Sequence, residues 1–277
     1  MSIQCDNNHL SKVQQYILDL LKEVIGIMDS MNITYYMQGG TMLGAIRHKG
    51  FIPWDDDVDL GLPRADYENF ITNVKKFLPA DMELRTYWDD TDHHYYFARI
   101  VDSRYKIKRN GSMTVRYENV WIDIFPLDGM PNEKPAQTVH KIRLTYYRLC
   151  FHLSTLDKVN ISRPGRSLIE KIIIKIAAVT NIGKLFNSKK CLDNIDKLLR
   201  RYPLSESKWI INFTGQTSYH FNELFKKEVY GKLTKYAFED LFMYGPEDYD
   251  KYLTSLYGDY MTPPKEGDRN AHGAEIV

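Results

Sequence analysis

The stretch "FIPWDDDVDL" (residues 51–60) restricts the fold of this chain more than any other part, because it places four carboxylates among apolar residues. In an extended strand, Asp57 and Asp59 lie on one face, and Val58 and Leu60 lie on the other. The apolar face needs a hydrophobic core, and the acidic face needs a positive charge, because crowded carboxylates repel one another. The stretch therefore predicts a strand that borders both a core and a charged site.

Helices and strands are expected to alternate around this strand. Apolar residues recur at helical spacing over 10–30, and a short strand is expected at 33–39. Gly39 and Gly40 should end that strand, so that a short helix covers 41–50. Similar patterns predict a helix over 63–78 with Phe77 facing inward and a strand within 95–102. They also predict a strand from 119 that Pro126 and the turn at 128–131 end, and mainly helices from 134 to about 200.

This order of elements predicts an α/β (α+β) protein with a mixed β-sheet flanked by helices. The chain has 277 residues, which suits one elaborated domain or a core with an appendage. We expect a core over 1–133, a largely helical insertion over 134–210, and a C-terminal segment over 211–277 that completes the charged site.

Composition argues against several classes of protein. The 37 basic and 36 acidic residues leave a formal charge of +1, which gives no reason to expect nucleic acid as a partner. Three scattered cysteines fit reduced thiols in the cytoplasm, and no apolar run reaches the roughly 20 residues needed to span a bilayer. The apolar stretch 168–186 is interrupted by lysines, so it predicts either a buried or half-buried helix or a helix lying on a membrane surface.

The acidic stretch is best explained as a binding site for a divalent metal ion. Hard cations such as Mg²⁺ or Mn²⁺ bind oxygen ligands, often one or two carboxylates together with water and phosphate. Asp57 and Asp59 supply two carboxylates, and Asp123, in the middle of a later apolar strand, is the best third ligand. The alternative is that these aspartates form turns and surface charge, which is the role expected of Asp55 and Asp56.

Residues just before the acids suggest a phosphate site. A Gly-Gly-Thr turn at 39–41 lies where a strand meets a helix N-terminus, and backbone N–H groups there can bind phosphate. Alone, either this turn or the basic triplet after it would be an ordinary surface feature. Together with the acids they fall within 21 residues, which favours a joint phosphate and metal site. The residues assigned to phosphate are Gly39, Gly40, Thr41, Arg47, His48 and Lys49.

The segment "GGTMLGAIRHKGFIPWDDDVDL" resembles the signature of the LicD family, whose members transfer phosphocholine and related phospho-alcohols to glycans. "VWIDIFPLDGMP" and "DKYLTSLYGDYMTPPKEGDRNAH" extend the resemblance, whereas residues 130–200 match poorly. The family resembles nucleotidyltransferases in fold. The resemblance implies a phosphate turn at 39–41, a metal-binding pair in Asp57 and Asp59, a third acid in Asp123, and phosphate contacts from Arg269 or His272.

The resemblance also implies an activity. We expect metal-dependent transfer of a phospho-alcohol from a CDP-linked donor, CDP-choline foremost, to a sugar hydroxyl of a cell-surface glycan or its lipid-linked precursor. Such a protein would work in the cytoplasm, with possible membrane contact through 168–186. Ribitol phosphate and glycerol phosphate stay open as the transferred group. The alternatives are a nucleotidyltransferase that releases pyrophosphate and a non-catalytic nucleotide-binding scaffold, which the complete set of acids disfavours.

A choline donor would need a pocket for a quaternary ammonium group. The chain contains 20 Tyr, 12 Phe and 4 Trp, and aromatic rings can enclose such a cation. Each of these residues is otherwise expected in the core. The candidates for a choline cage are Trp54, Trp88, Tyr95, Tyr96 and Trp121.

Overall fold

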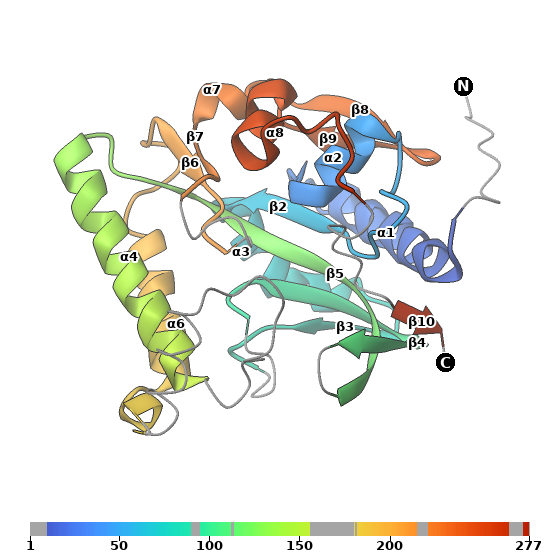
Figure 1. Ribbon diagram of the computed structural model, residues 1–277, viewed down its shortest axis with the longest axis horizontal. Helices are drawn as coiled ribbons and strands as arrows, with labels where there is room; N and C mark the ends of the chain where they lie inside the picture. The colour runs from blue at the N-terminus through green and yellow to red at the C-terminus, as the bar shows by residue number, and fades with distance from the viewer. Residues whose placement is uncertain are drawn as a thin grey trace.

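The computed structural model describes residues 10–89, 95–111, 114–155, 180, 182–214, 221–265 and 274–276. These residues form a curled mixed sheet of eight strands, a separate two-stranded hairpin, and seven α-helices (Figure 1). The predicted class, a mixed β-sheet flanked by helices, is confirmed. The proposed division of the chain into three parts stays a prediction.

The first part of the chain contains α1 (Lys12–Ser30), β1 (Tyr36–Met37), α2 (Gly39–Arg47), β2 (Asp59–Pro63), α3 (Arg64–Asn73), β3 (Met82–Arg85), β4 (Ala98–Gly111) and β5 (Thr114–Gly129). The remainder contains α4 (Lys134–Ser154), α6 (Ser188–Leu199), β6 (Trp209–Ile211), β7 (Leu224–Lys226), α7 (Lys227–Tyr230), β8 (Thr234–Phe238), β9 (Leu241–Gly245), α8 (Tyr249–Tyr257) and β10 (Ala274–Ile276).

Helix α1 forms where the apolar spacing predicted it, and it anchors the acidic loop. The Ser11 hydroxyl accepts a hydrogen bond from the Gln14 backbone N–H at 3.1 Å, and the Gln14 side chain accepts one from the Ser11 N–H at 3.0 Å. This capping box satisfies N–H groups that the helix cannot pair itself. The Gln14 amide also donates to the carbonyls of Ile52 (3.2 Å) and Asp55 (2.9 Å). One cap residue thereby fixes both the helix start and the loop that carries the aspartates.

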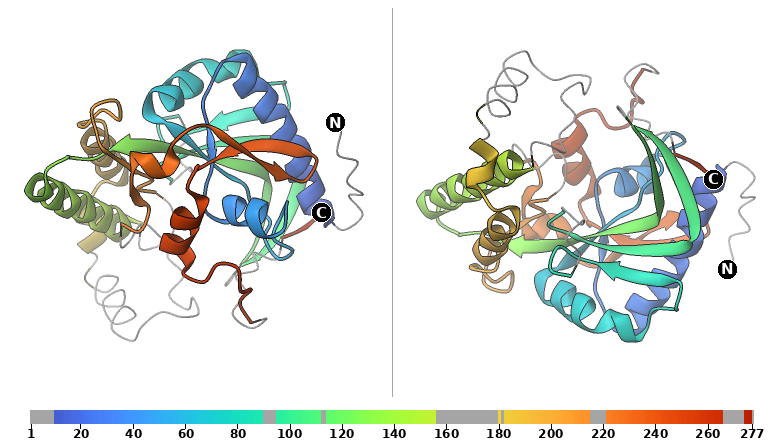
Figure 2. Two further views of the ribbon diagram at one scale, coloured as in Figure 1. Left: turned by 90° about the horizontal axis from the view of Figure 1, so that it is seen from above. Right: turned by 90° about the horizontal axis from the view of Figure 1, so that it is seen from below.

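The central strands run in the order β1-β2-β5-β4-β10, with β3 also paired to β4 and β6 joined to the end of β5. Strands β2 and β5 are parallel, whereas the other pairs are antiparallel. Helices α1 and α3 cover one face of the sheet, and α2 and α8 lie on the other (Figure 2). Both faces of β5 are therefore buried, including Ile122 and Ile124 on one side and Asp123 on the other.

Strand β5 passes through Pro126, contrary to that part of the prediction, and ends within the predicted turn at 128–131. It continues to Gly129, with Pro126 opposite Leu62 of the parallel neighbour. The antiparallel neighbour β4 begins opposite Ile124, and β6 pairs only from Asp128 onward. On this edge of β5, Pro126 therefore lies between the residues that pair with β4 and those that pair with β6. No neighbouring strand there needs a backbone N–H donor, so a proline is tolerated.

Three other boundaries differ from those predicted. Helix α2 already begins at Gly39, so the two glycines form its first turn instead of ending β1. Strand β2 begins at Asp59, which leaves Asp57 in the preceding loop. Helix α3 ends at Asn73 and a 3₁₀ turn (Val74–Lys76) follows, so Phe77 is rotated outward and is 48 % exposed.

The helical region after residue 134 is confirmed for α4 and α6, which pack against each other at one end of the sheet (Figure 1). Most of the predicted helix 168–186 lies outside the described residues. Its described end contains a 3₁₀ turn at Ile182–Leu185. Cys150 and Cys191 are buried free thiols between these helices.

Candidate active site

Two of the three predicted acids lie next to each other in the sheet. Asp59 is the first residue of β2, and its register partner on the parallel strand β5 is Asp123. The Asp123 N–H donates to the Val58 carbonyl at 3.0 Å, which locks the two strands at this point. Asp57 lies in the half-buried loop two residues before Asp59. The topology therefore brings together acids that are 64 residues apart in the sequence.

The carboxylate of Asp59 has an unfavourable environment in the absence of a cation. Its pKa is raised well above the ordinary value, first because burial penalises the charged form, and then because other carboxylates lie nearby. Two of these neighbours, Asp57 and Asp123, were predicted as members of the site. The other two, Asp55 and Glu223, were not.

The first turn of α2 lies beside these acids. A Cβ placed on Gly39, whose φ is +47°, would lie 3.6 Å from an Asp59 carboxylate oxygen, and one on Gly40 would lie 2.7 Å from an Asp55 oxygen. A side chain at position 40 would displace the Asp55 carboxylate, so glycine permits this close approach. The Thr41 hydroxyl accepts a hydrogen bond from the Asp59 N–H at 2.8 Å, which ties the helix to β2. A helix N-terminus favours negative charge, so it suits both the carboxylates and a phosphate.

A buried polar network holds this helix end in place. The Gly39 N–H donates to the Tyr252 hydroxyl at 2.9 Å, and the Tyr252 and Tyr230 hydroxyls donate to the Gln38 side chain at 3.3 and 3.1 Å. Gln38 in turn donates to the carbonyls of β1. Elements near the C-terminus therefore position a turn encoded near residue 39.

Arg99 is the cation that the structure pairs with Asp123. Its Nε lies 2.6 Å from an Asp123 oxygen, and both side chains are largely buried, with 16 % and 11 % exposed. The guanidinium also lies over the rings of Tyr95, at 4.1 Å, and Trp121, at 4.6 Å. Stacking on these rings fixes the guanidinium, so Arg99 orients the Asp123 carboxylate.

The basic triplet lies at the other end of α2. Arg47 donates to the Tyr260 carbonyl at 2.7 Å and lies over the Trp54 ring, which also packs edge-on against His48. Burial lowers the pKa of both Arg47 and His48. Lys49 is exposed, in a turn with φ of +63°. Arg269 and His272 lie outside the described residues.

Two residues near the C-terminus belong to the site, and sequence reasoning missed them. Glu223, 3 % exposed, precedes β7 and raises the pKa of Asp59. The pKa of Tyr257 is raised by burial and then by Glu223, Asp59 and Asp55, and its hydroxyl lies near Gly39. Glu223 lies outside every motif noted above, and Tyr257 lies inside the resembling segment 250–272 without a predicted role, so the fold is what places both residues beside the acids.

The five cage candidates occupy three different environments. Tyr95 and Trp121 enclose Arg99, and Trp54 packs with Arg47. Tyr96 hydrogen-bonds to Arg64 and Asp196 near α6, and its ring stacks with that of Tyr87, which also contacts Trp88. In the described residues, the five candidates therefore do not share one set of contacts.

The donor set fits a divalent cation, although the side chains are not arranged around one. Among the described residues, no group of three or more His, Cys, Asp or Glu side chains is placed to hold a metal ion. The oxygens are nevertheless hard ligands, and the raised pKa of Asp59 reflects a cluster that a cation would stabilise. Asp123 instead contacts Arg99.

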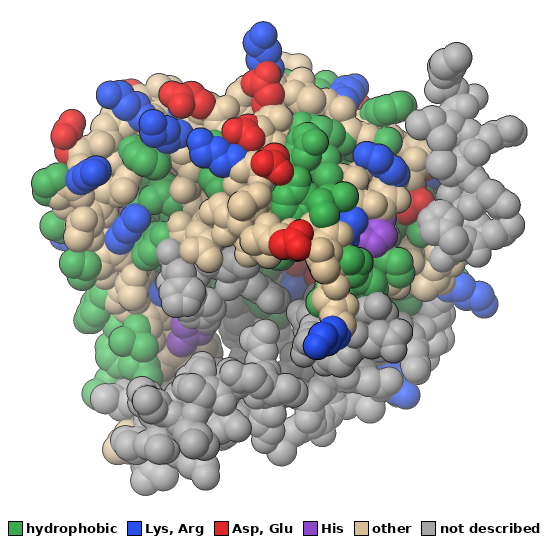
Figure 3. Space-filling model, turned by 45° about the horizontal axis from the view of Figure 1, so that its top comes forward, with side chains coloured by type: hydrophobic (Ala, Val, Ile, Leu, Met, Phe, Trp, Pro, Cys, Tyr) green, Lys and Arg blue, Asp and Glu red, His purple; other side chains and the backbone are tan. Residues whose placement is uncertain are grey.

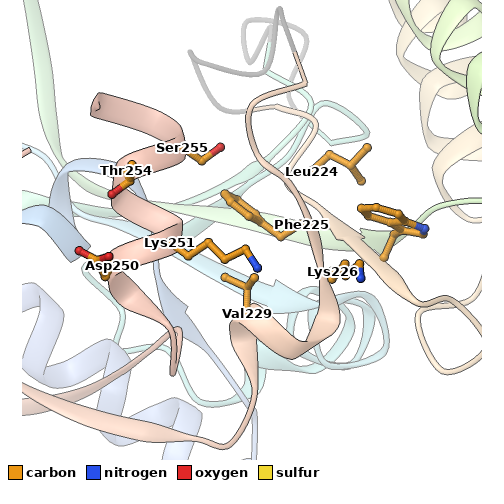
Figure 4. A pocket seen from close by; sticks show the side chains of 9 residues that line it. Leu224, Phe225, Lys226, Val229, Asp250, Lys251, Thr254 and Ser255 are labelled. Atoms are coloured by element: carbon orange, nitrogen blue, oxygen red, sulfur yellow. The ribbon is translucent and has the colours of Figure 1, made fainter. Parts of the chain in front are cut away.

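A pocket of about 610 Å³ adjoins this region through β7 (Figure 4). Apolar walls from Trp209, Leu224 and Phe225 face polar groups of α8 and β7, and Leu224 directly follows Glu223. The polar lining includes Lys226, Asp250, Lys251, Thr254 and Ser255. The lining therefore combines aromatic surface with hydroxyl and amine groups.

Parts of this chain are similar in sequence to known proteins. The family model of the LicD/FKTN/FKRP nucleotidyltransferase domain matches residues 32–158. These residues belong to the LicD family. Over 269 residues the chain is 28 % identical to lipopolysaccharide cholinephosphotransferase LicD of Haemophilus influenzae, and the alignment covers 95 % of each chain. A segment of 46 residues is 46 % identical to ribitol 5-phosphate transferase FKRP of Homo sapiens, covering 17 % of this chain and 9 % of FKRP.

The LicD-family segment includes β1, α2, β2 and β5, and hence all the predicted acids. Glu223, Tyr252 and Tyr257 lie after it, although they contact or influence the same turn and acids. The family domain is therefore completed by elements from outside the matched segment. None of the helices in the described ranges is both long and apolar enough to cross a bilayer.

Proposed function

We propose that this protein transfers a phospho-alcohol, phosphocholine foremost, from a CDP-linked donor to a sugar hydroxyl of a cell-surface glycan or its lipid-linked precursor. The observation that carries the proposal is the buried acid cluster at the N-terminus of α2 within a LicD-family domain. The similarity to lipopolysaccharide cholinephosphotransferase along almost the whole chain supports the transferred group.

The chain's own residues account for donor binding. The first turn of α2 offers backbone N–H groups to phosphate oxygens, and Arg47 and Lys49 add positive charge at the other end of the helix. We assign Asp57, Asp59 and Asp123 to a divalent cation, Mg²⁺ or Mn²⁺, with Asp55 as a further oxygen ligand. When bound, the cation would neutralise charge on the donor phosphates and the departing CMP.

The transfer itself needs alignment and one proton acceptor. The acceptor oxygen attacks the phosphorus that carries the alcohol, the bond from that phosphorus to the CMP oxygen breaks, and the hydroxyl proton passes to a carboxylate. We assign this role to Asp123, because Arg99 holds its carboxylate in one orientation. Arg99 is then a positioning residue.

A second candidate is nucleotidyl transfer, which the description of the matching domain favours. Here CMP or AMP would pass to the acceptor and pyrophosphate would leave. The same acids would serve either reaction, so the leaving group distinguishes them.

Product masses test the proposal. The protein is incubated with Mg²⁺ or Mn²⁺, an amino-sugar-containing glycan, and one of CDP-choline, CDP-ribitol, CDP-glycerol or CTP. We expect CMP release and a phosphocholine mass on the glycan, lost in Asp57→Asn and kept in Asp89→Asn, an exposed aspartate paired with Lys75. Pyrophosphate release with a nucleotide mass on the glycan would replace the proposal with nucleotidyl transfer.

A further inference from the structure

Helix α4 lies on the outside of the molecule, at one end of the sheet (Figures 1 and 2). Its inner face buries His140, Leu144 and Cys150. A second row of apolar side chains points outward at steps of three, four and three residues, which places them on one face of the helix. This row consists of Val139, Ile142, Tyr146 and Leu149, which are 56 %, 64 %, 55 % and 54 % exposed.

The same helix is strongly basic. It contains two lysines and two arginines, and no aspartate or glutamate occurs between Lys134 and Ser154. Residues 134–201 together contain 15 basic and 4 acidic residues, a formal charge of +11, whereas the rest of the chain has 22 basic and 32 acidic residues, or −10. The overall charge of +1 conceals this separation.

Some of these charges flank the apolar row directly. Lys134 and Arg143 are exposed, and Arg143 follows Ile142. By contrast, Lys141 lies 5.1 Å over the Phe221 ring, and the Arg148 guanidinium stacks on Phe213, so both point toward the protein. The neighbouring helix α6 adds exposed Lys189, Lys190 and Lys197. On the face turned forward in Figure 3, acidic and basic side chains are instead interspersed.

We propose that α4 docks on an anionic membrane surface, with the apolar row among the lipid chains and the flanking basic residues at the headgroups. An amphipathic helix with this combination binds bilayers through apolar burial and attraction to anionic lipid together. A second copy of α4 would bring like charges together. Nucleic acid would use the basic residues and leave four large apolar side chains in water.

Docking through α4 would also orient the acid cluster. Arg64 at the start of α3 forms buried ion pairs with Asp128 at the end of β5 and with Asp196 of α6. The basic helices are therefore fixed to the sheet that carries Asp59 and Asp123. A membrane-bound α4 would hold the site at a set height and angle above the lipid, where a lipid-linked acceptor could reach it.

Vesicle flotation tests the docking without donor, acceptor or turnover. The full chain is mixed with vesicles of phosphatidylcholine alone or with about a third phosphatidylglycerol. We expect binding to the anionic vesicles, weakened by salt. The double variant Ile142→Ser with Leu149→Ser should bind at least about tenfold more weakly, and Lys134→Gln with Arg143→Gln should lose about fivefold for each charge removed.

A matched control removes two exposed apolar side chains elsewhere. Leu233→Ser with Phe242→Ser, at positions 48 % and 53 % exposed near and on the β8–β9 hairpin, should bind vesicles like the wild type. All variants change exposed side chains, and circular dichroism verifies their folding. The proposal is overturned if the wild type ignores anionic vesicles, if the Ile142/Leu149 variant binds them equally well, or if the row mediates only self-association or DNA binding.

Discussion

Around Arg64, buried positive and negative charges alternate, whereas several carboxylates crowd around Asp59 and only Asp123 among them is paired above with an arginine, Arg99. Arg64 donates to both oxygens of Asp128 at 2.7 and 2.6 Å, and also to Asp196 and the Tyr96 hydroxyl. Arg200 then pairs with Asp196 at 2.5 Å. Two arginines and two aspartates thus satisfy one another. Near Asp59, by contrast, four other carboxylates raise its pKa.

This difference indicates that the Arg64 cluster has a structural role and that the Asp59 cluster has a functional one. A matched buried network joins α3, β5 and α6 and needs nothing from outside. Arg99 offsets part of the negative charge through Asp123, but the pKa of Asp59 is still raised, so we infer that the cluster is retained to bind a further cation. Substitutions in one cluster can therefore be compared with matched substitutions in the other.

The largest effect is expected from Arg64→Met. The side chain is 11 % exposed, and its loss leaves Asp128 and Asp196 buried without this partner. The free energy of unfolding should fall by about 3–5 kcal/mol, measured by urea denaturation. Lys75→Met breaks a surface pair in which both side chains are 57 % exposed, and it should cost less than about 1 kcal/mol. If both variants lost the same free energy of unfolding, the buried ion pairs of Arg64 would not stabilise the fold more than a surface pair does.

The same substitution should have opposite effects in the two clusters. In metal-free protein, Asp128→Asn should lower the free energy of unfolding by about 3 kcal/mol, because Arg64 loses its bidentate partner. Asp59→Asn should raise it, because one repelling charge disappears. It should also reduce turnover by about a thousandfold. If Asp128→Asn and Asp59→Asn both destabilised the metal-free protein, the Asp59 carboxylate would not be repelled by its neighbours as we infer.

The pH dependence of stability should identify Asp59 independently. Because its pKa is raised in the folded state above the ordinary 3.8, the folded protein binds more protons than the unfolded chain above that value. The free energy of unfolding of metal-free protein should therefore fall as pH rises above 3.8, relative to Asp59→Asn. Urea denaturation from pH 4 to 7 with a chelator measures the gap, which should widen with pH. A constant gap would show that Asp59 carries no raised pKa.

The smallest change in stability is expected from Gly40→Ala. The new Cβ would lie 2.7 Å from an Asp55 oxygen, so it should displace that carboxylate and lower kcat/KM about tenfold. Unfolding should change by less than about 1 kcal/mol, because alanine favours the helix. Gly26→Ala in α1, where nothing lies within 4 Å, is the matched control and should leave activity unchanged. Full activity in Gly40→Ala would remove Asp55 from the site.

Local patterns predicted the elements and part of the site. The apolar spacing of α1 predicted its buried face, and alternation around Asp59 and Asp123 predicted acids on neighbouring strands. The Pro126 prediction was wrong because the partners on that edge of β5 depend on where β4 and β6 begin. A proline ends a strand only where the sheet needs its N–H.

Residues from distant segments could not be predicted in this way. Arg99 lies in an ordinary apolar strand, and its contact with Asp123 depends on the β4–β5 register. Glu223 and Tyr257 reach the acids only because α8 and the segment before β7 pack beside α2. Such contacts carry no local signature, because they arise from the packing of whole elements.

Titration calorimetry with Mn²⁺ tests the central claim most directly, that the Asp59 cluster is built to bind a cation. Mn²⁺ is added to metal-free protein in the presence of CMP. The wild type and Asp89→Asn should bind it with equal affinity, and Asp59→Asn should bind at least about tenfold more weakly. Equal affinity in wild type and Asp59→Asn, or the absence of binding by the wild type, would contradict the account.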